Sequence, residues 1–467
     1  MSVGTATVLP LSFLESIRSE FPIDFASIEP SDLETYGRDW TKVFPPRASI
    51  LCRPRTTDEV SRLMRLCAQH RVPVIPSGGR TGLACGALAT CGELILSLER
   101  MRRMEPVDAL GGTLRVQAGA VIEAVHQHCA EAGLLWPIAL YSTGSQIGGS
   151  IATNAVGMRG VRYGLTRQWV LGLTVVLANG EVLQLNGALE KNNAGVDLRQ
   201  LFIDSEGILG IITEATLKLT LPPGKVDVLL LAVPSFEAVL QVFERARRAS
   251  FTLMAFESFT DRCLAHVIRH RQLKPPFDAP SSQYVLLEVT QAGRGAIEAW
   301  LESLFEPGLV AAATHARNSQ QAEELWTFRQ GIDVSLNAVG LVHGHNIALP
   351  ISRFHTFYTE LETLHAKSYP DWELCLFAHV GDGTLQVRII KPEALDKRTF
   401  LARCHAFDTA MFELVRAHQG GVSAEHGIGL LKKAWFAQSR SAAEIDLMRA
   451  LKRVMDPLGI LNPGKVL

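Results

Sequence analysis

The sequence predicts an α+β protein with two domains, and three observations lead to this prediction. The chain has 467 residues, more than a single hydrophobic core usually serves. Strand-like runs alternate with runs of helical periodicity in both halves of the chain. Between the halves, Pro222-Pro223-Gly224 is the clearest break in regular structure. We therefore expect one domain on each side of this break.

Two amphipathic helices are predicted near the start of the chain, at residues 11–21 and 54–70. Thr57 or Asp58 is expected to cap the second helix, because short polar side chains accept hydrogen bonds from the first turn. The apolar face of this helix comprises Val60, Leu63, Met64 and Cys67.

The rest of the first half is predicted to be rich in strands. Strands are expected at residues 71–76, 93–98, 113–118, 171–178, 181–185 and 213–220, and one helix is expected at 121–132. The runs on each side of Asn179-Gly180 predict a β-hairpin, because Asn-Gly tolerates the positive φ angles of a two-residue turn. In the second half, strands are expected at 226–233 and 284–290 and helices at 235–249 and 295–305.

Composition and charge exclude several classes of protein. The chain is 47% hydrophobic and 20% charged, as is typical of a soluble globular protein. A net charge of -1 gives no basic field for nucleic acid. The eight cysteines are scattered, which favours reduced thiols and a cytoplasmic location over a disulfide framework. We find no secretory signal and no apolar run long enough to span a bilayer, although peripheral attachment to a membrane stays open.

Two glycine-rich segments carry the strongest functional signal. They are Pro76–Gly86, PSGGRTGLACG, and Tyr141–Gly164, YSTGSQIGGSIATNAVGMRGVRYG. Glycine allows sharp turns and close approach of the backbone, and each segment lies beside a strand-like run. Two ordinary surface loops are the alternative. The pair together favours backbone N–H groups that surround a phosphate-bearing cofactor.

Other cofactor and nucleophile motifs are absent from the sequence. There is no G-x-G-x-x-G for a nicotinamide cofactor and no G-x-S-x-G nucleophile elbow. The G-x-x-x-x-G-K pattern at 459–465 has no Ser or Thr after it, and the chain ends two residues later. We interpret that match as chance.

Three short clusters in the second half combine histidine with carboxylate or amide residues. They are His343-Gly-His345, the segment from His379 to Gln386, and Glu425-His426. In a strand, His343 and His345 would share one face, as would Thr384, Gln386 and Arg388. Imidazole and carboxylate together bind a divalent metal or move a proton, whereas a structurally hydrogen-bonded histidine is the alternative for each site.

Six motifs, in this order, resemble those of the FAD-linked oxidases of the vanillyl-alcohol-oxidase (PCMH-type FAD-binding) fold. They are PSGGRTGL, STGSQIGGSIATNAVGMRGVRYG, DLRQLFIDSEGILGIIT, AHVGDGTLQV, SAEHGIG and LNPGKVL. The branch that looks nearest contains the D-2-hydroxy-acid dehydrogenases, including D-lactate and D-2-hydroxyglutarate dehydrogenases and the flavin subunit of glycolate oxidase. The resemblance implies a two-part FAD-binding domain at 1–222 with its core at about 46–222. It also implies an α+β substrate (cap) domain at 223–422 and a C-terminal segment, 423–467, that returns to the FAD domain.

The resemblance also implies which residues hold the FAD, which we expect to be non-covalent. The first loop would bind the pyrophosphate through backbone N–H groups, and the second would line the flavin and ribityl chain. The residues implied are Pro76, Ser77, Gly78, Gly79, Arg80, Thr81, Gly82, Leu83, Ser142, Thr143, Gly144, Gln146, Ile147, Gly148, Gly149, Asn154, Gly157, Arg159, Gly164, Gly207, Ile212 and Asn462.

The substrate site implied by the resemblance departs from the family pattern at Gln386, at Thr384, where the family has asparagine, and at Gly344. His379 and Glu425 match metal ligands, but Gln386 replaces a second histidine and is a weaker ligand for zinc or manganese. Gly344 stands where a lysine is expected. His426 matches the base for the substrate hydroxyl, and Arg329 matches a partner for a substrate carboxylate.

Three functions follow from these residues as alternatives. In the first, a flavin dehydrogenase oxidises a small D-2-hydroxy acid, with His426 as base and with Arg329 and Arg388 holding the acid. A metal at His379 and Glu425 could polarise the hydroxyl, with His343 or His345 replacing the missing ligand. In the second, the enzyme oxidises another alcohol, a sugar or a phenol without metal. In the third, the chain is a flavin-carrying subunit without activity of its own. The electron acceptor (a quinone, a cytochrome, an electron-transfer flavoprotein or oxygen) and a homodimer stay open.

Overall fold

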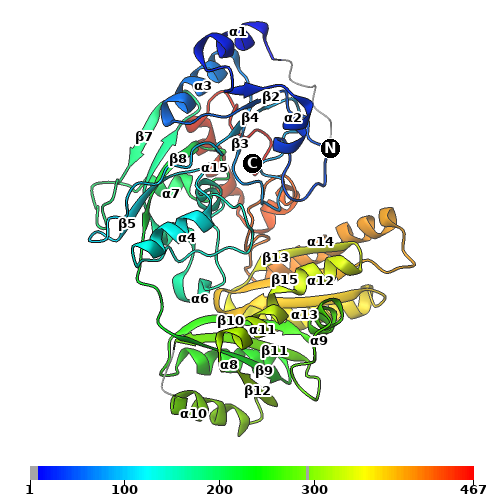
Figure 1. The fold of residues 1–467 in the computed structure, drawn as a ribbon. Coiled ribbons are helices and arrows are strands. Elements are labelled where there is room, and N and C mark those ends of the chain that lie inside the picture. Colours follow the sequence, from blue (N-terminus) through cyan, green and yellow to red (C-terminus); the bar gives the residue numbers. More distant parts are fainter. Residues whose placement is uncertain (1–8, 291–293) are drawn as a thin grey trace. The chain divides into compact units, whose positions relative to one another are not determined.

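The computed structural model describes residues 9–290 and 294–467, which form two compact units (Figure 1). The first unit contains residues 1–158, 165–222 and 425–467, and the second contains 159–164 and 223–424. The division after Pro222 coincides with the Pro-Pro-Gly break in the sequence. In the part of the chain that the structure describes, no helix has both the length and the apolar character needed to cross a membrane.

The first unit is built on two four-stranded sheets. One sheet has the order β1-β2-β4-β3, with β4 parallel to both neighbours, and the other has the antiparallel order β5-β8-β6-β7. The strands are β1 (Ala26–Ser27), β2 (Ile50–Cys52), β3 (Val74–Ser77), β4 (Leu94–Ser97), β5 (Thr113–Gln117), β6 (Val170–Val176), β7 (Val182–Leu185) and β8 (Ile211–Lys218). The helices are α1 (Leu11–Glu20), α2 (Pro30–Tyr36), α3 (Thr57–His70), α4 (Ile122–Glu131), α5 (Ile147–Ala152), α7 (Arg199–Phe202) and α15 (Ala442–Met455).

The predicted elements of this unit are present, with small changes at their ends. The hairpin around Asn179-Gly180 is β6–β7, and the four residues of the predicted apolar face of α3 are completely buried. The cap of α3 was predicted one residue late, because Thr56 rather than Thr57 accepts a hydrogen bond from the backbone N–H of Glu59. Thr56 keeps extended backbone angles while its side chain reaches the first turn.

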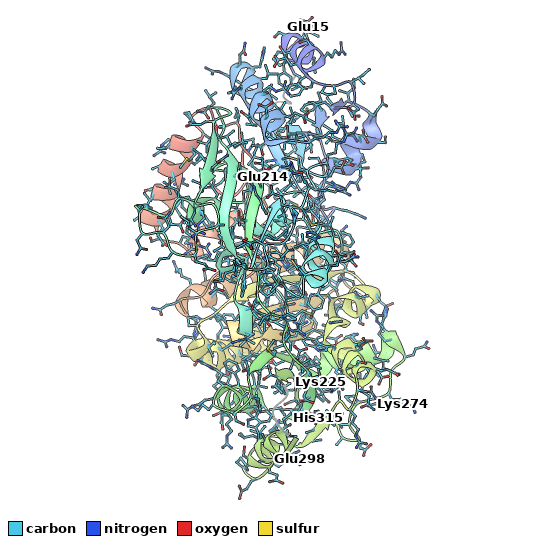
Figure 2. All side chains as sticks on the ribbon, turned by 60° about the vertical axis from the view of Figure 1, so that its left-hand side comes forward. Glu15, Glu214, Lys225, Lys274, Glu298 and His315 are labelled. Carbon is cyan, nitrogen blue, oxygen red and sulfur yellow. The ribbon has the colours of Figure 1, made fainter. Side chains whose placement is uncertain are left out.

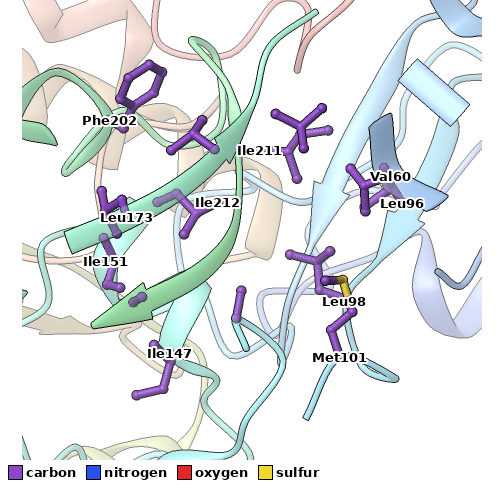
Figure 3. Close-up of a cluster of buried hydrophobic side chains, with 14 of the residues drawn as sticks. Val60, Leu96, Leu98, Met101, Ile147, Ile151, Leu173, Phe202, Ile211 and Ile212 are labelled. Atoms are coloured by element: carbon purple, nitrogen blue, oxygen red, sulfur yellow. The ribbon is translucent and has the colours of Figure 1, made fainter. Parts of the chain in front are cut away.

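One hydrophobic core lies between these sheets and their helices (Figure 3). The second glycine-rich segment contributes to it, because α5 directs Ile147 and Ile151 inward, where both are completely buried. Arg115 of β5 donates to the largely buried carboxylate of Glu214 of β8 at 2.6 Å (Glu214 is labelled in Figure 2). All eight cysteines are free thiols, and only Cys91 is partly exposed.

The second unit is a seven-stranded antiparallel sheet with helices on both faces. Its strand order is β12-β9-β11-β10-β14-β15-β13. The strands are β9 (Val226–Val233), β10 (Leu253–Thr260), β11 (Gln283–Thr290), β12 (Ala312–His315), β13 (Val342–Ala348), β14 (Glu373–His379) and β15 (Thr384–Ile390). The helices are α6 (Gly160–Tyr163), α8 (Phe236–Arg247), α9 (Asp261–Arg271), α10 (Arg294–Phe305), α11 (Ser319–Gln330), α12 (Ile332–Val339), α13 (Phe354–Ser368) and α14 (Lys397–Ala417).

The two faces of this sheet carry different helices (Figure 1). Helices α9, α11 and α12 pack on one face, around a core that includes Phe377 of β14. Helices α8, α13 and α14 lie on the opposite face. Because side chains alternate along a strand, successive strand residues face opposite sides of the sheet and therefore different helices.

Candidate functional site

The two glycine-rich loops lie in contact within the first unit. A Cβ atom on Gly79 would lie 2.1 Å from the carbonyl oxygen of Gly144, so only glycine allows this approach. The hydroxyl groups of Thr81 and Ser145 are 2.9 Å apart and add a second link between the loops. Segments that are more than 60 residues apart therefore form one backbone-lined surface.

Left-handed backbone angles recur along this surface. The φ angles are 58° at Arg80, 85° at Gly144 and 48° at Asn154. Residues other than glycine rarely adopt such angles, and changes of backbone hand direct successive N–H groups to one side. The surface is therefore suited to binding an anion through amide hydrogens, as a pyrophosphate requires.

Buried polar atoms in and beside the loops are also suited to a polar ligand. Among the described residues, the side-chain atoms Ser77 Oγ, Gln146 Oε1, Ser150 Oγ and Asn462 Oδ1 are buried and have no hydrogen-bond partner within the protein. Such atoms are costly to leave unpaired. The hydroxyl, amide and phosphate groups of FAD offer suitable partners, so the residues present fit this cofactor.

The C-terminal segment completes this part of the first unit. Asn462 bridges two loops, because its Nδ2 donates to the carbonyl oxygens of Gly86, at 3.1 Å, and Glu206, at 2.8 Å. The neighbouring Gly207 has a φ angle of 73°, and a Cβ atom there would lie 3.1 Å from Pro76. Asn462 and Gly207, both predicted to meet FAD, therefore lie beside the first glycine-rich loop.

Other predicted cofactor residues have different surroundings. The side chains of Ile147 and Ile212 are buried in the hydrophobic core. A Cβ atom on Gly157 would lie 2.8 Å from backbone atoms of Ala139. Arg159, in the second unit, donates to Glu288 at 2.7 Å. The remaining predicted residues are Gly164 in the second unit, Gly148 (against Ala118) and Gly149 in α5, Pro76 in β3, and Gly78, Gly82, Leu83, Ser142 and Thr143 in the two loops.

Glu425 and His426 belong to a strained loop of the first unit. His426 has a φ angle of 72°, which is unusual for a residue with a side chain. The carboxylate of Glu206 accepts hydrogen bonds from the backbone N–H groups of Ile428, at 2.7 Å, and Gly429, at 2.8 Å. Strained backbone of this kind occurs at functional sites when surrounding contacts hold it.

The second unit contains a buried network around Glu257 of β10. Its carboxylate accepts from Nε of Arg329, at 2.8 Å, and lies 2.7 Å from Nδ1 of His379. Burial would raise the pKa of Glu257, but the positive charge of Arg329 and the hydrogen bonds donated by His379 and Arg329 outweigh it and hold that pKa below its usual range. Glu257 is therefore ionised, and it fixes both predicted residues in one place.

The opposite nitrogen of His379 faces hydrogen-bond donors. Its Nε2 lies 2.9 Å from Nε2 of Gln386 and 3.3 Å from Nη2 of Arg329. With Nδ1 donating to Glu257, Nε2 is the acceptor for both. An amide N–H and a cationic guanidinium occupy the side of the ring where a metal would bind, so these residues do not fit a divalent ion at His379.

Arg388 of β15 lies over Gly344 of β13. A Cβ atom on Gly344 would lie 2.6 Å from Cδ of Arg388, so the absence of a side chain at this position makes room for the arginine. Nε of Arg388 donates to Asp333 at 2.8 Å. Arg388 and Arg329 both lie close to the ring of Phe377, at 5.2 and 4.8 Å from its centroid. Two guanidinium groups thus share one aromatic side chain.

His343 and His345 cannot supply the missing ligand at His379, which corrects that expectation. Strand pairing places Gly344 opposite Arg388, on the face of the sheet that carries Gln386 and His379. His343 and His345 alternate with Gly344, and therefore lie on the opposite face.

Sequence analysis missed three residues of these networks, Glu206, Glu257 and Asp333. Glu257 carried a signal, because it is a carboxylate inside the apolar strand LMAFESFT. Buried carboxylates are rare unless they are paired. Glu206 lies in a motif that we identified, but its partners are more than 220 residues away.

Comparisons with known proteins cover nearly the whole chain. Residues 48–186 match the family described as "FAD binding domain", and residues 222–466 match "FAD linked oxidases, C-terminal domain". D-2-hydroxyglutarate dehydrogenase of Xanthomonas citri pv. viticola is 44% identical over 97% of this chain and 96% of the relative. The Stutzerimonas stutzeri protein of the same name is 38% identical over 93% of this chain and 94% of the relative.

Solved structures share the fold at low sequence identity. The 4-ethylphenol oxidase from Gulosibacter chungangensis gives a TM-score of 0.77 at 16% identity, over 99% of this chain and 98% of that chain. An alkyldihydroxyacetonephosphate synthase gives 0.74 at 17% identity, over 100% of this chain and 88% of that chain. At these identities the likeness shows the fold alone.

Proposed function

This chain belongs to the FAD-linked oxidase family and is an FAD-dependent oxidoreductase, and we propose that its substrate is a D-2-hydroxy acid with a second carboxylate. D-2-hydroxyglutarate is the first candidate, because relatives with that activity in their names align over more than nine-tenths of the chain. The single observation that supports a second carboxylate on the substrate is the pair of guanidinium groups, those of Arg329 and Arg388, beside Phe377.

We assign the two arginines to the two ends of the substrate. A guanidinium presents a planar fork of donors that matches a carboxylate. Glu257 holds Arg329 and Asp333 holds Arg388, so both forks are oriented before the substrate binds. Such preorganisation lowers the entropy lost on binding.

We assign proton removal from the substrate hydroxyl to His426. Imidazole is the side chain best suited to accept a proton near neutral pH. Bound FAD would supply the acceptor for the hydride that leaves the α-carbon. The proton passes to His426 and the product is the 2-oxo acid.

We infer that this reaction needs no divalent metal at His379. The inference rests on the donor set, because Gln386 and Arg329 direct N–H groups at Nε2 of this histidine. Arg329 also carries the positive charge that a metal would otherwise supply. We assign His379 to positioning Arg329 and the substrate.

A substrate panel under anaerobic conditions tests the proposed function. Bleaching of the flavin absorbance would be followed with D-2-hydroxyglutarate, its L enantiomer, D-lactate, glycolate, a primary alcohol and a phenol. The proposal expects fastest reduction by D-2-hydroxyglutarate and none by the L enantiomer. Reduction by the alcohol or the phenol, with no response to any hydroxy acid, would overturn it.

A further inference from the structure

A second histidine cluster lies in the second unit, away from the network around Glu257. His343 and His345 of β13 and Asp408 of α14 each place a ligand atom within 4.8 Å of the other two. Nε2 of His343 lies 2.8 Å from Oδ1 of Asp408, and Nε2 of His345 lies 2.9 Å from the same oxygen. The Nε2 atoms of both imidazoles thus lie beside one carboxylate oxygen.

These separations are close to those of a zinc site. Bonds of about 2.0–2.1 Å at tetrahedral angles place neighbouring ligand atoms roughly 3.3 Å apart. The two histidine–aspartate separations differ from this value by a few tenths of an ångström, and small rotations of the side chains would remove this difference. His-x-His on a strand presents both rings on one face without any change of backbone.

The charge of the cluster also favours a cation. Asp408 lies in the interior of α14 and its side chain is only 3% exposed. Within the described residues, the ion pairs of Asp408 are those with the two histidines. Imidazole binds a metal in its neutral form, so a bound divalent cation would supply the positive charge that balances this buried carboxylate.

Access from solvent completes the requirements for a metal. β13 is the edge strand of the sheet, and the side chain of His343 is 22% exposed. A fourth coordination position filled by water is therefore available on this side. A second group of possible ligands, His266, Glu373 and Cys375, lacks this access at Cys375, whose thiol is completely buried and hydrogen-bonded to that of Cys263.

We propose that His343, His345 and Asp408 bind one divalent transition-metal ion of the zinc type, on the sheet face opposite to His379. The ion would join the edge strand β13 to α14 and neutralise Asp408. Zinc recovered with this protein would then come from this site and not from His379.

Zinc binding to the FAD-loaded enzyme tests the proposal. After chelation and removal of the chelator, the enzyme would be dialysed against zinc and the bound metal measured by elemental analysis. We expect one zinc per chain, and a visible ligand-field spectrum when cobalt replaces it. His343→Gln and His345→Gln should each weaken binding by more than about 100-fold.

Two further variants separate this site from other histidines. His355→Gln removes an exposed histidine of α13, and His379→Gln removes the histidine bonded to Glu257. Both should retain the zinc. Because His343 lies at the solvent edge, its variant should fold, and circular dichroism would confirm this. No zinc in the wild-type enzyme, zinc retained by both the His343 and His345 variants, or zinc lost with His379→Gln would each overturn the proposal.

Discussion

The carboxylate of Glu206 accepts a hydrogen bond from the backbone N–H of Gly429, at 2.8 Å. The other oxygen of Glu206 accepts from Ile428, so one side chain holds the loop that contains His426. A Cβ atom on Gly427 would lie 2.4 Å from Cδ of Glu206, so this packing also requires glycine. The left-handed conformation of His426 is thus maintained by a residue that lies 220 positions earlier in the chain.

The first prediction concerns pH and this carboxylate. Burial raises the pKa of Glu206 to about 7, above the ordinary value of 4.5. The folded state therefore binds more protons than the unfolded state between these values, and the contribution of Glu206 to stability falls as pH rises through this window. The glutamine in Glu206→Gln cannot ionise. The free energy of unfolding of this variant, relative to that of wild type, should therefore increase by roughly 1–3 kcal/mol between pH 4.5 and 8.

Urea unfolding of the holoenzyme at several pH values measures this difference. Glu244→Gln, which changes a carboxylate exposed on α8, is the matched control and should follow the wild-type curve. A Glu206→Gln curve that stays parallel to wild type throughout this range would contradict the assignment.

The second prediction concerns the binding of the second carboxylate. Arg388→Met should increase KM for D-2-hydroxyglutarate by about 10- to 100-fold, because a charge-assisted hydrogen bond is lost. The efficiency with D-lactate, which has one carboxylate, should change little. Steady-state kinetics measures KM and kcat/KM of the variant with each of the two substrates. Arg403→Met removes an arginine from the exposed pair with Asp371 and should change neither substrate. Equal losses on the two substrates would show that Arg388 only supports the fold.

The third prediction concerns the buried ion pair of Glu257 and Arg329. Glu257→Gln removes the carboxylate charge that pairs with Arg329, in a site where both side chains are at most 5% exposed. Removal of one partner of such a pair destabilises a protein by about 3–5 kcal/mol. Chemical denaturation gives this value. Glu360→Gln breaks the partly exposed pair with His418 and should cost under about 1 kcal/mol. Similar losses in both variants would argue against a buried charge network.

The fourth prediction concerns the contact between the glycine-rich loops. Gly79→Ala places a methyl group 2.1 Å from the carbonyl oxygen of Gly144, so the loops must separate. FAD affinity, measured by flavin fluorescence after dilution, should fall at least about tenfold. Gly224→Ala adds a methyl group with no heavy atom within 4 Å and should leave the affinity unchanged. Tight FAD binding by folded Gly79→Ala would contradict the role of this contact.

Local patterns in the sequence predicted most elements and several juxtapositions. His343, Gly344 and His345 lie on one strand, so alternation places the two histidines on one face and Gly344 on the other. Glycine-rich composition identified the two loops, although α5 and its buried isoleucines were not expected within the second one. Periodicity and turn chemistry are properties of neighbouring residues, so they can be predicted from a single sequence.

Long-range pairing could not be predicted in this way. Glu257 meets Arg329 and His379 across 72 and 122 positions, and no local pattern specifies such partners. The substitution of Gln386 raised the question of a metal, but only the geometry shows donors directed at Nε2 of His379. Tertiary structure, rather than composition, therefore decides the chemistry of this site.

Reduction of the metal-depleted holoenzyme by D-2-hydroxyglutarate tests the central claim most directly. Chelation should remove any zinc held by His343, His345 and Asp408, while the network around Glu257 stays intact. The account predicts complete anaerobic bleaching of the flavin, at a rate that zinc or manganese does not change. A flavin that stays oxidised until one of these metals is restored would contradict it.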